Sequence, residues 1–375
     1  MRKKIHFILV FLSTILFISC KTATDKVTKI EDIKLDVKIQ EEEISLNDEF
    51  SDFEIIPLEN REECLLSNVR KMIVTDNNMY FWDEGPSSQV LSFNLDGKFK
   101  TAIGKKGHAK GEYLSIQDIA TTEKGDTIVM VNIPDICLYN KEGKYLFSLP
   151  LKNEKGIESI LLTDNNIYLG FFHRQENSII KVFSKDAKKA KDIIETPCDP
   201  IRKTLGVDNI TLVQQDNDII ICLDAFDSSF YVCSKKNPQD IKRYSFRLKD
   251  MLTEDVSRKP EDDDNGIFRI TSYQIYNGIV RGTVTNNIDY YDFKFNLSGT
   301  VVEFTHHKEF DFSFACNHSG FFYYLLPADA LMDYMDKKKT YLNPIRELLD
   351  ENLSKMEGKI LNTDNFYIIK MRAKR

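Results

Sequence analysis

The sequence predicts an all-β protein, a six-bladed β-propeller whose blades are four-stranded antiparallel sheets. Composition is the first indication, because 25 Phe and 16 Tyr suit the pleated, half-buried surface of a strand. The second is an internal repeat that returns every 44 to 46 residues. The third is the recurrence of Asn, Asp and Gly between apolar runs, where tight hairpin turns need a positive φ.

Two short phrases carry the repeat. A turn followed by an apolar run, TDNNMYF, begins at Thr75 and returns as TDNNIYL at Thr163, 88 residues later. An aromatic residue, a polar turn and a second run begin at Phe93, Tyr139 and Phe183, which are 46 and 44 residues apart. Each unit therefore contains four short strands, and a unit of roughly 40 to 50 residues is typical of a propeller blade.

The repeat also predicts how the ring begins and closes. The first strands of the six blades are expected near Val69, Ile116, Ile157, Ile210, Phe268 and Asp311. Helical spacing over about 327–358 interrupts the last blade, which then has one more strand at 364–372 and lacks a fourth. We expect DFEIIPLE, residues 52–59, to pair with that strand and close the ring, which leaves no open sheet edge between the ends of the chain.

The N-terminus has the layout of an export signal. A positive segment, an apolar segment and the sequence FISC predict a signal peptide over 1–19, followed by a lipidated Cys20. A plain cleaved signal is the alternative. Residues 20–43 are polar and charge-mixed, and we expect them to form a flexible tether before the propeller at 44–375. No later stretch contains 18 uninterrupted apolar residues, so the lipid would be the membrane attachment, at the cell envelope on either side of an outer membrane.

Three stretches carry a family resemblance: FEIIPLENREECLLSNVRKM, IGKKGHAKGEY and NTDNFYIIKMR. Together they resemble the six-bladed β-propeller lipoproteins of Bacteroides-type bacteria, relatives of the NHL-repeat propellers. The resemblance covers about residues 44–372 and fades in the fourth and fifth blades. It implies the fold and export from the cytoplasm, but no biochemical activity for any residue of this chain.

Charge and cysteine content exclude several partners. The net charge is −7, and removal of residues 1–19 makes it −10, which disfavours nucleic acid as a partner. Six cysteines remain besides Cys20, without a CxxC pair or a histidine at zinc-ligand spacing, so neither a metal nor another cofactor is expected. Cys222 and Cys233 flank one hairpin symmetrically, and a disulfide between them is an open alternative to two buried thiols.

The most conspicuous stretch is AIGKKGHAKGEYLSIQD, residues 102–118. Its glycines fit neither a Walker A loop nor a dinucleotide-binding loop, because Glu112 follows the last glycine and a strand is expected next. We interpret it as the crossing from one blade to the next, with Tyr113 packed between blades. If the crossing loops lie at the channel mouth, candidate binding residues are Lys105, Lys106, His108, His173 and Arg174.

Two functions are compatible with this reading. The favoured one is a non-catalytic scaffold that binds an unknown ligand or envelope protein, since no catalytic motif accompanies the ring. The alternative is a propeller hydrolase or lyase with a metal on the axis, for which the inner strands offer Asp118, Asn209, Glu158 and Asp311. A looser calcium site at Glu261, Asp263 and Asn265 is a further alternative, but an EF-hand is excluded because Ser272 occupies the twelfth position.

Overall fold

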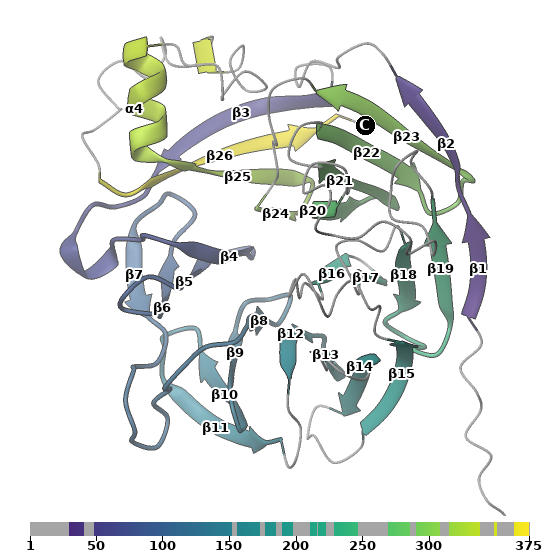
Figure 1. Ribbon diagram of the computed structural model, residues 1–375. Coiled ribbons are helices and arrows are strands. Elements are labelled where there is room, and N and C mark those ends of the chain that lie inside the picture. Colours follow the sequence, from purple (N-terminus) through teal and green to yellow (C-terminus); the bar gives the residue numbers. More distant parts are fainter. Residues whose placement is uncertain are drawn as a thin grey trace, which may run out of the picture.

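The computed structural model describes residues 30–40, 49–151, 156–172, 177–184, 190–197, 211–215, 217–222, 229–246, 269–285, 290–307, 315–337, 349–350 and 364–374. They form six antiparallel sheets arranged as a ring, which confirms the predicted β-propeller (Figure 1). Within these ranges, no helix has both the length and the apolar character needed to cross a membrane.

Each blade runs from an inner strand at the axis to an outer strand at the rim. Blade 1 consists of β4 (Val69–Val74), β5 (Met79–Asp83), β6 (Gln89–Phe93) and β7 (Phe99–Ala102). Blade 2 consists of β8 (Ile119–Thr121), β9 (Thr127–Asn132), β10 (Asp135–Asn140) and β11 (Tyr145–Pro150). Blade 3 consists of β12 (Ile157–Leu162), β13 (Asn166–Phe172), β14 (Asn177–Ser184) and β15 (Ala190–Pro197).

The second half of the ring adds strands from the N-terminal segment. Blade 4 consists of β16 (Thr211–Gln215), β17 (Asp218–Cys222), β18 (Ser229–Ser234) and β19 (Ile241–Ser245), with β1 (Ile30–Lys34) outside β19. Blade 5 consists of β20 (Arg269–Tyr276), β21 (Ile279–Thr285), β22 (Tyr290–Asn296) and β23 (Val301–His307), with β2 (Asp36–Gln40) outside β23. Blade 6 consists of β24 (Cys316–His318), β25 (Phe321–Pro327), β26 (Phe366–Ala373) and β3 (Phe50–Pro57).

The inner strands begin close to where the repeat predicts them. Strands β4 and β12 start at Val69 and Ile157 as expected, β16 and β20 start one residue later, and β8 starts at Ile119. Strand β24 starts at Cys316, whereas the expected start at Asp311 lies outside the described residues.

Burial explains why the middle strands are apolar throughout. All five residues of β5, the sequence MYFWD, are buried, because both faces of a blade pack against neighbouring blades. Strand β7 at the rim instead alternates half-buried and exposed residues. Apolar clusters fill the interfaces between blades; the one between blades 1 and 2 contains Tyr80 and Ile103 on one side and Ile128 and Tyr139 on the other. The hydrophobic core is therefore divided into wedges around the axis.

The repeated turn phrases form repeated structures. In the first phrase, the Thr75 and Thr163 hydroxyls each donate to the carbonyl of the Asn three residues later, at 3.1 Å in both turns. In the second phrase, the Asn94 and Asn140 side chains each accept the backbone N–H four residues later, at 2.8 Å in both. The two phrases thus mark corresponding hairpins of successive blades.

The closure of the ring is the predicted one, shifted by two residues. Strand β3 pairs antiparallel with β26, so that Ile56 lies opposite Ile368 and Ile55 opposite Ile369. The Asn365 side chain secures the joint, since its amide donates to the Cys64 carbonyl at 2.9 Å and to the Glu59 carbonyl. Strand β3 is therefore the fourth strand of the last blade.

The tether predicted at 20–43 is wrong for residues 30–40. Strands β1 and β2 run along the rim in parallel with β19 and β23 (Figure 1), and Leu35 between them is buried in the cluster of blades 4 and 5. The propeller therefore begins at residue 30 and not at 44. Edge strands pair through their backbone and leave charged side chains in solvent, which gives them the composition of a tether. Residues 1–29, including the signal and Cys20, lie outside the described residues.

The helical insertion in the last blade is present as α4 (Ala328–Lys337). Leu331 and Tyr334 are buried against blade 6, and the Tyr334 hydroxyl donates to the Asp350 carboxylate at 3.0 Å. Residues 338–348 and 351–358 of the predicted insertion lie outside the described residues.

Candidate functional site

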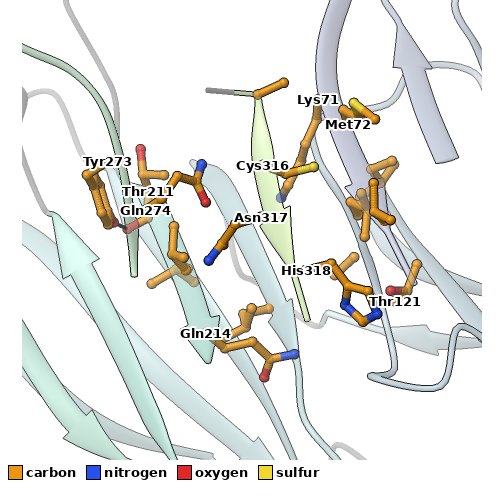
Figure 2. Close-up of a pocket in the computed structure, with 18 of the residues that line it drawn as sticks. Lys71, Met72, Thr121, Thr211, Gln214, Tyr273, Gln274, Cys316, Asn317 and His318 are labelled. Carbon is orange, nitrogen blue, oxygen red and sulfur yellow. Dashed lines mark hydrogen bonds between the residues drawn. The ribbon is translucent and has the colours of Figure 1, made fainter. Parts of the chain in front are cut away.

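A cavity of about 920 Å³ runs along the axis of the ring. The inner strands of all six blades line it, and Figure 2 shows labelled side chains from five of them: Lys71, Met72, Thr121, Thr211, Gln214, Tyr273, Gln274, Cys316, Asn317 and His318. This volume lies within the usual size of small-molecule binding sites. The cavity forms because inner strands of a ring cannot pack against one another across the axis.

A buried carboxylate fixes the wall on one side. Asp118 is 5% exposed and immediately precedes β8. The Lys71 ammonium of blade 1 donates to its two oxygens at 2.8 and 2.9 Å. The backbone N–H groups of Ile119 and of Ile160 in blade 3 donate to it at 2.8 Å each. One side chain therefore joins the inner strands of three neighbouring blades, and its oxygens are occupied.

Two more polar contacts between blades lie at the hairpin end of the cavity. His318 Nε2 of blade 6 lies 2.9 Å from the Asp76 carboxylate of blade 1. Lys235 of blade 4 contacts Glu123 of blade 2. Asp76 and Glu123 are mostly exposed, so solvent screens both contacts and each contributes little stability. At this end of the site, the Lys235–Glu123 pair places opposite charges together.

Side-chain amides project from three adjacent blades (Figure 2). They belong to Gln214 of β16, Gln274 of β20 and Asn317 of β24. The amide nitrogen of Asn317 donates to the Ile275 carbonyl, and that of Gln214 lies 3.5 Å from the Leu162 carbonyl. The backbone thus holds the NH₂ end of two of these amides and orients them.

The cysteine and tyrosine of the wall are held in their neutral forms. Burial raises the pKa of the Cys316 thiol to about 12, so the nucleophilic thiolate is scarce at neutral pH. Burial likewise raises the pKa of Tyr273 well above its ordinary value. The Tyr273 hydroxyl donates to the Thr211 carbonyl, which ties blade 5 to blade 4.

The glycine-rich stretch is the predicted crossing between blades 1 and 2. Tyr113 is buried in the cluster between those blades, as expected. Gly104 and Gly111 have φ of 67° and 83°, a conformation that other residues adopt only with strain. A Cβ on Gly104 would lie 2.8 Å from the Tyr139 ring, and one on Gly111 would lie 2.6 Å from the Tyr145 ring. These glycines therefore permit both the turn and the close approach to blade 2.

The predicted binding residues of that loop are exposed and lie apart from the cavity. Lys105, Lys106 and His108 are on the solvent side of the crossing, and none of them lines the axial cavity. His173 and Arg174 lie outside the described residues. Apart from Asp118 and Glu158, the sequence analysis missed the cavity residues, because Thr, Gln and Asn in alternating strands form no motif. Their signal in the sequence is their position in the first strand of each repeat.

Of the four axial metal candidates, Asp118 and Glu158 line the cavity, whereas Asn209 and Asp311 lie outside the described residues. In the part of the chain that is described, no three His, Cys, Asp or Glu side chains group as metal ligands. The calcium candidates Glu261, Asp263 and Asn265 also lie outside it.

Cys222 and Cys233 are not joined by a disulfide. The register of β17 and β18 places Cys233 opposite Ile219, and the two side chains pack into clusters on opposite faces of the blade. The two cysteines are therefore buried thiols, and the disulfide alternative is excluded because the strand register is not symmetric about the midpoint between them.

Comparison with known proteins identifies a family and a shared fold, but it does not identify an activity. A family described as "Domain of unknown function (DUF4934)" matches residues 30–372. No curated protein matches the chain. The crystal structure of a protein described as exported, from Bacteroides fragilis NCTC 9343, is similar with a TM-score of 0.67 at 14% identity, covering 92% of this chain and 100% of that one.

Two other solved structures are more distant. The N-terminal domain of Nup159 has a TM-score of 0.38 at 10% identity, over 75% of this chain and 71% of that one. YCF48 bound to D1 peptide has a TM-score of 0.41 at 10% identity, over 74% of this chain and 80% of that one.

Proposed function

The chain belongs to the DUF4934 family, and we propose that it is an exported, lipid-anchored propeller that binds a ligand in its axial cavity without transforming it. The observation that carries this proposal is the cavity itself, which six inner strands line. Asp118 is occupied by Lys71 and two backbone N–H groups, and the Cys316 thiol is protonated at neutral pH. Such a wall supports recognition better than bond breaking.

Two features support the location at the cell envelope. The segment before residue 20 has the order of a secretory signal, and FISC ends it at Cys20. A protein of the same fold is described as exported. Because β1 begins at Ile30, only the residues between Cys20 and Ile30 would separate a lipid anchor from the rim of blade 4.

The anchor is tested by changing its attachment atom. Cys20→Ala should move the protein out of the membrane fraction, or leave its precursor uncleaved, whereas Cys64→Ala should leave both unchanged. Fractionation with immunoblotting measures both outcomes. If the Cys20→Ala protein keeps its size and stays in the membrane, lipidation at this position is refuted.

The binding site is tested by filling the cavity. Thr211 lines the cavity from β16, and Thr211→Trp should abolish the thermal stabilisation that a bound small molecule produces. Thr300→Trp, at an exposed position outside the cavity, is the matched control. Thermal melts of both variants with a library of small polar metabolites and saccharides provide the measurement. A ligand that stabilises the Thr211→Trp protein as much as the parent protein would place binding outside the cavity. Chemical turnover of a bound compound would refute the non-catalytic role and show that the protein is an enzyme.

A further inference from the structure

The fixed charges of the axial cavity cancel locally. Its described lining contains four basic side chains (Arg70, Lys71, Lys124 and Lys235) and four acidic ones (Asp76, Asp118, Glu123 and Glu158). Three of the acids are already within ion-pair distance of a cation or a histidine. Charges that alternate at contact distance leave little net field along the axis, so the cavity offers no general attraction to an anion or a cation.

The remaining polar lining consists mainly of amides and hydroxyls. The Asn317 amide nitrogen donates to the Ile275 carbonyl, which fixes the amide and leaves its acceptor oxygen and its second N–H outside that bond. The Gln214 oxygen is buried and has no hydrogen-bond partner among the residues that the structure describes, whereas the Gln214 nitrogen lies near the Leu162 carbonyl. Thr121 and Thr211 add hydroxyls from blades 2 and 4 (Figure 2). The wall thus combines fixed acceptors with hydroxyls that both donate and accept.

Apolar patches lie between these polar groups. Ile73, Leu161, Val213 and Leu325 line the same cavity as the amides. A ligand that fits must therefore present hydrogen-bond donors together with apolar C–H surface. Sugars have this pattern, because each hydroxyl both donates and accepts while the ring faces carry C–H groups.

We infer that the axial cavity takes a neutral carbohydrate of several sugar rings. This inference rests on the proposed function and specifies its ligand. An acidic sugar would place carboxylates beside the amide oxygens of Asn317 and Gln214, and a cationic peptide would meet Lys71 and Lys235. Each of these ligands would lose solvation without gaining a net opposite charge. A neutral sugar meets neither penalty.

The test is calorimetric titration of the full-length protein, purified from membranes in a detergent without a sugar headgroup. The probes are neutral tri- to hexasaccharides of glucose, mannose, xylose and galactose, the matching galacturonic acid oligomers, trilysine and N-acetyl-trialanine amide. We expect at least one neutral oligosaccharide to bind, and galacturonic acid oligomers of the same length to bind at least tenfold more weakly.

Variants locate the binding to the amides. Asn317→Leu and Gln214→Leu should each raise the Kd of the neutral oligosaccharide about tenfold. This is the typical effect of removing one hydrogen bond and leaving its partner unsatisfied. Gln117→Leu makes the same change at an exposed position outside the cavity and should have no effect. If either leucine variant fails to fold, Asn317→Ala and Gln214→Ala, which remove the same acceptor oxygen with a smaller side chain, should weaken binding of the neutral oligosaccharide in the same titration.

The outcomes separate the two proposals. If an acidic oligomer or a peptide binds in place of every neutral sugar, and Thr211→Trp abolishes that binding, the inference of a neutral carbohydrate is overturned and the axial binding site is kept. Absence of binding by all the neutral saccharides would also overturn the carbohydrate. A neutral sugar that binds Thr211→Trp unchanged would overturn both.

Discussion

The crossing loop between blades 1 and 2 and the wall of the axial cavity contrast sharply in sequence and in use. The loop contains three glycines, three lysines and a histidine within eight residues, Gly104 to Gly111. Its glycines nevertheless have a structural role, because they allow the loop to approach the rings of Tyr139 and Tyr145 closely. The wall is drawn from six segments spread from β4 to β24, and its residue types are ordinary for strands. The difference teaches that, in a propeller, a conspicuous sequence motif can have a purely local role in joining two blades. The binding site is instead assembled from single residues of every repeat.

The largest expected effect tests whether the loop is structural. Gly111→Val should lower the free energy of unfolding by about 4 kcal/mol, because a strained positive φ and a clash with the Tyr145 ring add together. Gly278→Val is the control: Gly278 also has a positive φ, but a Cβ there meets nothing within 4 Å. Urea denaturation measures both variants. Equal losses in the two proteins would show that the close approach to blade 2 is unimportant.

The next effect tests whether the wall also holds the ring together. Asp118→Ala should cost about 3 kcal/mol, because Lys71 loses its partner and two backbone N–H groups lose their acceptor. Glu54→Ala breaks an exposed contact with Lys370 at 3.0 Å and should cost less than about 1 kcal/mol. The same denaturation experiment compares them. If Asp118→Ala is as mild as the control, the three-blade joint contributes nothing.

A smaller effect isolates one contact of the loop. Tyr139→Phe removes the hydroxyl that donates to the Gly111 carbonyl at 3.2 Å and retains the ring between the blades. We expect a loss of about 1 kcal/mol, the usual net value of such a hydrogen bond. A thermal melt gives the change. No loss at all would mean that the glycines, and not this bond, position the loop.

The smallest expected effect concerns the conspicuous charges. Changing Lys105, Lys106 and His108 together to Ser should alter stability by less than about 0.5 kcal/mol, since all three are exposed. Binding in the axial cavity should also be unchanged, because none of the three lines it. Melts and ligand titrations of the triple variant check both statements. Lost cavity binding with intact stability would reassign the loop from a joint to part of the site.

The fold was predictable because each blade repeats the same local chemistry. The Thr turn at Thr75 and Thr163 and the Asn turn at Asn94 and Asn140 set the period, and the period placed the inner strands to within a few residues. The edge strands were harder to predict. Ile33, Leu35, Val37 and Ile39 do alternate, but the charged residues between them resemble a solvated linker.

The site was less predictable than the fold. Asp118 was a candidate for the axis, yet its partners Lys71 and Ile160 come from other blades, and no sequence spacing brings them together. The amides of Gln214 and Asn317 were not singled out, because their role depends on which side of a strand faces the axis. That choice is set by the packing of blades and not by any local pattern.

The pairing of β3 with β26 has a consequence for the order in which the molecule can assemble. Asn365 donates to the Glu59 carbonyl, 306 residues earlier in the chain, so the joint unites an early strand, β3, with the last strand to be synthesised, β26. Until synthesis ends, β3 has no partner and its edge is open to other chains. Closure of the ring therefore competes with aggregation through the open edge of β3. The proposed passage through a membrane with the N-terminus first would lengthen the time for which that edge is unpaired.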